Sequence, residues 1–140
     1  MNPVLNQFTQ FYERLTLSSL DQLESIYAND VVLQDPVHRV LGLAGVRRYF
    51  AAMLANVQSC RFDIKHTVEQ NGEAFVSWEM SLVHPKLNSG DPVIVSGVTH
   101  LQFNQRIYFH RDYFDMGSML YEQLPVIGAI VRRIKSGLAV

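Results

Sequence analysis

Two polar side chains that could move a proton lie two residues apart near the end of the chain. His110 and Asp112 fall within residues 106–115, where apolar and aromatic residues predict a strand. Because side chains alternate along a strand, both are expected on the same face of a sheet. Imidazole titrates near neutral pH, and a carboxylate in an apolar cavity can act as a general base. The pair therefore predicts an acid–base site if that face borders a cavity.

The register of the last two predicted strands decides whether that face points inward. If residues 104–105 form a two-residue turn, Thr99 faces His110 and Gly97 faces Asp112. The preceding strand is apolar on the same face, so we expect this face to point into the protein. Gly97 would then leave space beside the Asp112 carboxylate. A slip of one residue would turn the opposite set of side chains inward.

Hydrophobic spacing and turn residues predict the elements that must position these side chains. Helices are indicated over residues 4–15, 20–27, 43–57, 117–124 and 126–135, and strands over residues 31–35, 61–69, 74–84, 93–103 and 106–115. This order indicates an α+β fold with three N-terminal helices on a curved, mostly antiparallel sheet and an extra C-terminal helix. Three helices leave part of such a sheet uncovered, which favours an apolar ligand cavity.

Three local signals set boundaries between these elements. Ser19 followed by Gln22 matches a capping box at the start of the second helix. Asn71-Gly72 predicts the turn of a hairpin. Asp115 is expected to cap the short helix that follows it.

Several stretches of the chain are similar to one known superfamily. They are residues 11–15 (FYERL), 26–30 (IYAND), 32–37 (VLQDPV), 45–50 (GVRRYF), 100–104 (HLQFN) and 109–115 (FHRDYFD). On these residues the chain resembles the NTF2-like superfamily, in its ketosteroid isomerase and SnoaL-like branch. The resemblance implies an NTF2-like cone over residues 1–124, followed by a tail at 125–140. It also implies a pocket for a small hydrophobic molecule, with isomerase-, cyclase- or epoxide-hydrolase-like acid–base catalysis or with non-catalytic binding.

The resemblance offers two carboxylates as the base. Asp35 falls where the isomerases hold their general base, although Asp followed by Pro is also a typical turn that ends a strand. Asp112 falls near the water-activating carboxylate of the epoxide hydrolases, or could instead pair with a nearby arginine. The donor positions of the isomerases hold Phe11 and Thr99, and Tyr12 is expected to point elsewhere on its helix.

The predicted site therefore consists of catalytic candidates and of residues that line a pocket. The catalytic candidates are Asp35, Asp112 and His110. The expected pocket-lining residues are Phe11, Tyr27, Trp78, Met80, Val95, Thr99, Tyr108 and Phe114. The histidines lack the spacing of a metal site, and the sequence has no nucleotide-binding motif, so we expect neither a metal nor a cofactor.

Composition narrows the class of protein. A chain of 140 residues with 48% hydrophobic and 18% charged residues is typical of one globular domain. The net charge of −1 argues against a nucleic-acid partner, which normally requires a basic face. Cys60 is the only cysteine, so no intrachain disulfide can form. Together with the lack of a signal peptide or an apolar membrane span, this favours a cytoplasmic protein.

Two surfaces are predicted to meet partners. The outer face of the last strands, which includes His100, Arg111 and Tyr113, suits packing against a second copy of the sheet, so a homodimer is expected. The tail at 125–140 is basic and amphipathic. It could close the cavity, pack on a partner subunit or touch an anionic membrane, and we favour the first two over membrane contact.

Overall fold

The computed structural model describes residues 1–119 and 125–139. The helices are α1 (Pro3–Glu13), the 3₁₀ helix η1 (Leu17–Gln22), α2 (Leu23–Ile26), α3 (Gly42–Ala55), the 3₁₀ turn η2 (Asn88–Gly90), α4 (Met116–Met119) and α5 (Pro125–Leu138). The strands are β1 (Tyr27–Gln34), β2 (Arg39–Leu41), β3 (Ser59–Gln70), β4 (Glu73–Val83), β5 (Val93–Phe103) and β6 (Ile107–Phe114). The predicted α+β cone with three N-terminal helices is confirmed.

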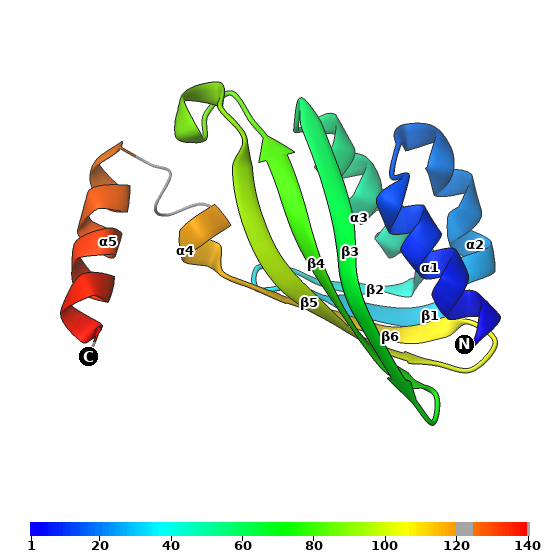
Figure 1. Cartoon of the computed structure of the whole chain (residues 1–140). Helices are drawn as coiled ribbons and strands as arrows, with labels where there is room; N and C mark the ends of the chain where they lie inside the picture. The colour runs from blue at the N-terminus through cyan, green and yellow to red at the C-terminus, as the bar shows by residue number, and fades with distance from the viewer. Residues whose placement is uncertain (120–124, 140) are drawn as a thin grey trace.

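The strands form one curved sheet in the order β2-β1-β6-β5-β4-β3. β1 pairs with β6 in parallel, and the other neighbouring strands pair antiparallel. The helices α1, α2 and α3 lie together on one face of this sheet (Figure 1). Apolar side chains from that face and from the helices form the core. The site is built in the same layer, between the helices and the sheet.

The first helix turns both Phe11 and Tyr12 toward the core. Pro3 occupies its first turn, and Asn2 Oδ1 accepts the Val4 N–H at 2.9 Å as the N-cap. Phe11 and Tyr12 are both buried, at 1% and 2% exposure. The prediction that Tyr12 points elsewhere is therefore wrong, because the helix presents both rings to the core.

The segment between α1 and β1 also differs from the predicted single helix. Thr16 is the N-cap of η1, and its backbone N–H donates to Ser19 Oγ at 2.9 Å. The capping box therefore begins three residues before the predicted one, with Ser19 as its second member. Tyr27 opens β1 instead of ending a helix, and its side chain is fully buried.

Two other local predictions are confirmed. Asn71 and Gly72 form the turn between β3 and β4 with φ of 52° and 76°, the left-handed values that such a turn requires. Asp115 Oδ1 accepts the Gly117 N–H at 2.7 Å and so caps α4. The rest of the predicted short helix, residues 120–124, lies outside the described residues.

The β5–β6 connection is not the predicted two-residue turn. Three residues separate the strands, and Phe103 pairs with Ile107. The next pair is Gln102 with Phe109, so Tyr108 is the extra residue of a bulge. The bulge turns Tyr108 outward, where it is 42% exposed, and the prediction that it lines the pocket is wrong.

Beyond the bulge, the register is shifted by two residues from the predicted one. Thr99 pairs with Asp112, and Leu101 pairs with His110. The predicted opposing residues are therefore wrong. Because the side-chain period of a strand is two residues, the same side chains still face inward. His110 is fully buried and Asp112 is 8% exposed, which confirms the predicted face.

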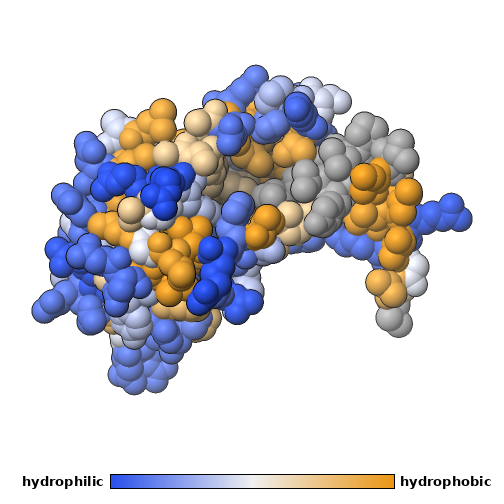
Figure 2. All heavy atoms as spheres, turned by 180° about the vertical axis from the view of Figure 1, so that it is seen from behind, coloured by the Kyte–Doolittle hydropathy of each residue, from blue (hydrophilic) through white to orange (hydrophobic). Residues whose placement is uncertain are grey.

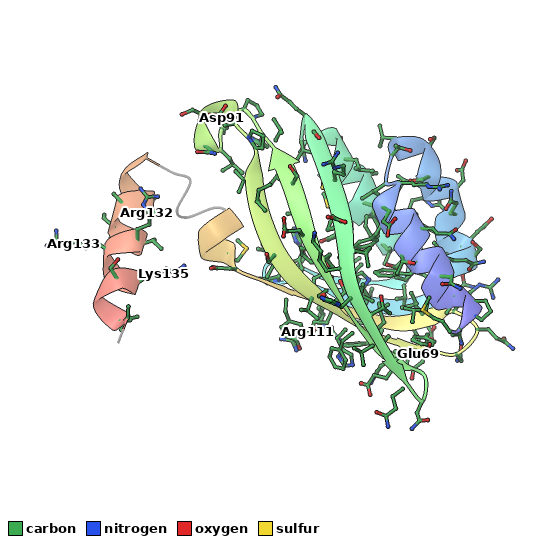
Figure 3. The ribbon with its side chains drawn as sticks, in the orientation of Figure 1. Glu69, Asp91, Arg111, Arg132, Arg133 and Lys135 are labelled. Atoms are coloured by element: carbon green, nitrogen blue, oxygen red, sulfur yellow. The ribbon has the colours of Figure 1, made fainter. Side chains whose placement is uncertain are left out.

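The C-terminal helix stands apart from the sheet (Figure 1). Apolar side chains gather on it (Figure 2), and those that are exposed are Ile127, Ile130, Ile134 and Leu138. Its charged side chains are Arg132, Arg133 and Lys135 (Figure 3), of which Lys135 Nζ lies 3.3 Å from Asp115 Oδ2. None of the described helices has both the length and the apolar character needed to cross a membrane. The division into a domain at 1–124 and a tail at 125–140 stays a prediction.

Candidate functional site

A cavity of about 650 Å³ lies between α3, β2 and the ends of β3, β4 and β6. Five of its buried lining residues form what we call the floor: Tyr12, Phe50, Phe62, Trp78 and Asp112. Six of its exposed lining residues form what we call the mouth. Four are charged or polar and two are apolar: His38, Arg39, Arg48 and Asn56, and Val37 and Leu41. Most of the remaining wall is apolar, so a bound molecule would lose water from most of its surface.

The floor carboxylate belongs to a continuous chain of hydrogen bonds. An indole N–H can only donate, so Trp78 Nε1 donates to Thr99 Oγ1 at 2.8 Å. The Thr99 hydroxyl then donates to Asp112 Oδ1 at 2.5 Å. His110 Nε2 lies 2.8 Å from the same oxygen, and the Tyr27 hydroxyl lies 2.8 Å from His110 Nδ1. With Asp112 ionised, Nε2 carries the hydrogen and Nδ1 accepts from Tyr27.

This chain leaves one carboxylate oxygen for the cavity. Both hydrogen bonds of Asp112 fall on Oδ1, and Oδ2 makes none within the part of the chain that the structure describes. Asp112 lines the cavity and is otherwise buried. The arrangement fixes the carboxylate by one oxygen and leaves the other without a partner among the described residues, in a residue that lines the cavity.

Two tyrosine hydroxyls surround His110. Tyr12, which lines the floor, places its hydroxyl 3.4 Å from His110 Nε2, and Tyr27 lies on the other side of the ring. Burial raises the pKa of both tyrosines well above the usual value, and the nearby negative charge of Asp112 raises it further. Both therefore stay protonated and available as donors.

Asp35 lines the same cavity, but its oxygens are occupied. Oδ1 accepts the backbone N–H groups of Val37 at 2.7 Å and His38 at 2.6 Å, which is a turn held by an aspartate. Oδ2 accepts the Tyr49 hydroxyl at 2.7 Å and lies 3.0 Å from His38 Nδ1. Burial raises the pKa of Asp35, but the hydrogen bonds from Tyr49, Val37 and His38 outweigh it and hold the pKa below its ordinary value.

We expect Asp35 to stabilise the fold in a pH-dependent way. Because its pKa is lowered in the folded state, its contribution is present above the unfolded pKa and is lost as the pH falls through the folded pKa. Asp35→Asn mimics the protonated acid, so it should lower the free energy of unfolding by about 1–2 kcal/mol at neutral pH. Urea unfolding from pH 7 into the acid range should show this difference shrinking. A difference that does not change with pH would contradict the assignment.

The structure brings together some of the predicted site residues and leaves others aside. Those that line the cavity are Asp35, Asp112, Trp78, Met80 and Phe114. Those that are buried in the core and do not line it are Phe11, Tyr27, Val95, Thr99 and His110. Thr99, His110 and Tyr27 act on the site through the hydrogen bonds to Asp112, whereas Phe11 packs edge-on against Phe50 with 5.4 Å between the ring centres.

Most lining residues were not predicted, and three of these carry a hydroxyl or a thiol: Tyr12, Tyr49 and Cys60. Tyr12 continues the apolar spacing of α1, so the i, i+4 pattern from Phe8 could have identified it. Tyr49 could have been found only through its contact with Asp35, which no sequence spacing shows. Cys60 faces the cavity, and burial raises the pKa of its thiol to about 11, so it stays protonated at neutral pH.

The described residues hold neither a metal site nor a second cavity lined by the catalytic candidates. Within residues 1–119 and 125–139, no three His, Cys, Asp or Glu side chains are placed to hold a metal ion. A second, polar groove of about 540 Å³ runs between α2 and the β5–β6 loop. Of the predicted site residues, only Tyr27 borders it.

The fold and the cavity define the class of this protein. A curved sheet that wraps around three N-terminal helices and leaves an apolar cavity is an NTF2-like α+β cone. The profile of the SnoaL-like domain family matches residues 8–110, and the chain belongs to that family. A comparison with curated proteins finds no significant match.

Solved structures share the fold at low sequence identity. A polyketide cyclase candidate from Acidithiobacillus ferrooxidans is 22% identical with a TM-score of 0.70, over 86% of this chain and 91% of that one. An NTF2-like protein of unknown function from Burkholderia pseudomallei is 17% identical with a TM-score of 0.75, over 86% and 96%. A protein with a ketosteroid isomerase-like fold from Catenulispora acidiphila, in complex with trimethylamine, is 16% identical with a TM-score of 0.74, over 89% and 96%. These likenesses establish the fold.

Proposed function

We propose that this protein binds a small, largely apolar molecule in the cavity and that Asp112 removes a proton from it. One observation carries the proposal: Asp112 is a buried carboxylate that lines an apolar cavity, and Thr99 and His110 hold its Oδ1 while Oδ2 has no hydrogen-bond partner among the described residues. A carboxylate fixed in this way needs little rearrangement to accept a proton. The SnoaL-like family and the related fold that holds trimethylamine support a small-molecule ligand.

The surrounding groups suit this chemistry. When Asp112 takes a proton from carbon, negative charge develops on the bound molecule. The Tyr12 hydroxyl, which borders the same floor, is the donor best placed to stabilise that charge. His110 and Tyr27 would act as positioning residues that hold the carboxylate. Asp35 remains the alternative base, but four hydrogen-bond donors already occupy its oxygens.

The proton transfer can be tested with a surrogate substrate, without knowing the natural one. The C3 proton of 5-nitrobenzisoxazole is removed by one general base as the N–O bond breaks, and 2-cyano-4-nitrophenolate is released with a yellow absorbance. The proton passes to Asp112 and from there to water. We expect the protein to exceed an equal concentration of acetate by at least about a hundred-fold, the range of general-base catalysis. A rate equal to that of acetate would remove the catalytic proposal.

The alternative is a non-catalytic binding module. It is favoured by Phe11 and Thr99, which stand where the related isomerases hold their donors. Trp78 is the only tryptophan and forms part of the floor, so its fluorescence reports binding independently of catalysis. Quenching of Trp78 by 5-nitrobenzisoxazole without product formation would select this alternative.

We also propose that the uncovered sheet face contacts a second copy of the chain. Phe75 is 46% exposed and stacks on His100 with ring centres 4.5 Å apart. Tyr113 is 47% exposed, and the Arg111 guanidinium lies 4.7 Å from the centre of its ring. Arg111 points away from the helices (Figure 3). This face carries exposed rings, the Arg111 cation and the Glu73 carboxylate, which contacts His100 Nε2, so it holds both members of self-complementary contacts.

Light scattering of purified variants tests this dimer. Phe75→Asp combined with Tyr113→Asp places negative charge at the centre of the face, so we expect the mass to fall from dimer to monomer. Ile130→Asp changes an exposed residue of α5 in the same way and should leave the mass unchanged. If Ile130→Asp alone produced monomers, the subunit contact would run through α5 instead of the sheet.

A further inference from the structure

The mouth of the cavity carries two arginines from different elements. Arg39 lies on β2 and Arg48 lies on α3, and both border the cavity. Both residues are exposed. An arginine presents several N–H donors in one plane, which suits paired hydrogen bonds to a carboxylate.

Neither arginine has a partner of opposite charge. Across the residues that the structure describes, Arg39 and Arg48 make no ion pair and no side-chain hydrogen bond. The neighbouring Arg47 differs, because its guanidinium donates to the Leu20 carbonyl at 3.1 Å. Two unpaired positive charges therefore stand where a ligand must enter.

The acidic residues of the cavity do not neutralise this charge. Asp35 is bound by its own turn, by Tyr49 and by His38. Asp112 lies at the floor and is held by Thr99 and His110. The cavity is therefore polar at both ends, with positive charge at the mouth, an apolar wall and a carboxylate at the floor.

We propose that the molecule bound in this cavity is an organic anion: an apolar body that carries a carboxylate, held at the mouth by Arg39 and Arg48. This inference rests on the proposed function and adds the substrate class. A carboxylate at the floor would face the charge of Asp112, whereas at the mouth it meets unpaired cations. The charge on the ligand therefore orients it, so that the end remote from its carboxylate meets Asp112 Oδ2.

A matched pair of ligands tests the inference. Anthraquinone-2-carboxylate and anthraquinone-2-carboxamide have the same rings and nearly the same shape, and differ in charge. Quenching of Trp78 fluorescence measures the binding of each. We expect the carboxylate to bind at least about ten-fold more tightly at low salt, and high salt to reduce this preference.

Variants that remove the two arginine charges test whether the preference for the carboxylate ligand arises at the mouth. Arg39→Gln combined with Arg48→Gln should bring the two dissociation constants to within about two-fold of each other. Arg61→Gln is the matched control, because Arg61 is exposed on β3 between two residues that line the cavity, and alternation places it on the other face. This variant should keep the full preference for the carboxylate.

The binding results that would overturn this inference can be told apart from failure of the proposed proton transfer. Equal binding of the two ligands to the unmodified protein would overturn the inference while leaving the cavity as a binding site. So would a preference that survives in the double variant. Absence of binding by either ligand would also overturn it, whereas the proton-transfer proposal stands or falls by the 5-nitrobenzisoxazole rate.

Discussion

Asp112→Asn should lower the rate of 5-nitrobenzisoxazole cleavage by at least about a hundred-fold, because it removes the base and little else. The amide has almost the same shape as the carboxylate, and its oxygen can still accept from Thr99 and His110. The group facing the cavity then becomes an amide NH₂, which cannot take a proton. Binding measured by Trp78 fluorescence should change far less than the rate.

Two further variants make this result specific. Asp63→Asn removes an exposed carboxylate of β3 that pairs with Lys65 at 2.7 Å, and it should leave the rate unchanged. Asp35→Asn tests the other candidate base. If it lowered the rate as much as Asp112→Asn does, the proton would pass through both carboxylates. If it alone lowered the rate, the base would be Asp35, and Asp112 would be a buried structural acid.

The pair of His110 and Asp112 shows how far sequence reasoning reaches in this fold. The predicted strand register was shifted by two residues, yet both side chains face inward as expected. The reason is physical: a shift by the side-chain period exchanges neighbours without exchanging faces. The face of a strand could therefore be predicted, whereas the hydrogen bond from Thr99 to Asp112 could not, because it depends on which residues stand opposite each other.

Other errors have local causes that the sequence does not display. Strict alternation up to the turn predicts that Tyr108 lines the pocket, but a bulge adds one residue there. β2 was not predicted, since three residues are too few to show a pattern. Arg39 and Arg48 reach one mouth only because β2 and α3 meet beside the cavity, a contact between elements that periodicity within one element cannot reveal.

Gly97→Ala should be the most damaging single-methyl change in the sheet. Gly97 is predicted from the sequence to leave space beside Asp112, but the register pairs it with Trp78 on β4 and with Phe114 on β6. A Cβ at this position would stand 2.6 Å from Cζ2 and 2.8 Å from Cζ3 of the Trp78 indole, and closer still to Cη2. These distances are impossible for real atoms, and the rigid indole cannot bend to relieve them. Either the ring or the strand must move.

The surroundings of the ring make that movement costly. Its N–H donates to Thr99 Oγ1 at 2.8 Å, and the indole and the Phe62 ring form a T-shaped pair with ring centres 5.2 Å apart. We expect Gly97→Ala to lower the free energy of unfolding by about 2–3 kcal/mol, in the range of overpacked cores. Urea unfolding measures the loss, and Gly137→Ala in α5, where a Cβ would meet nothing within 4 Å, is the control.

A second readout connects this glycine to the chemistry. Trp78 fixes the direction of the Thr99 hydroxyl, and that hydroxyl fixes Oδ1 of Asp112. If the indole is displaced, the proton-transfer rate should fall even in the fraction of Gly97→Ala that remains folded. Replacing Trp78 by leucine as well should restore stability relative to Gly97→Ala but not the rate, because the space returns and the donor does not. Recovery of both would show that the indole only fills the wall, and that Asp112 is oriented by His110 alone.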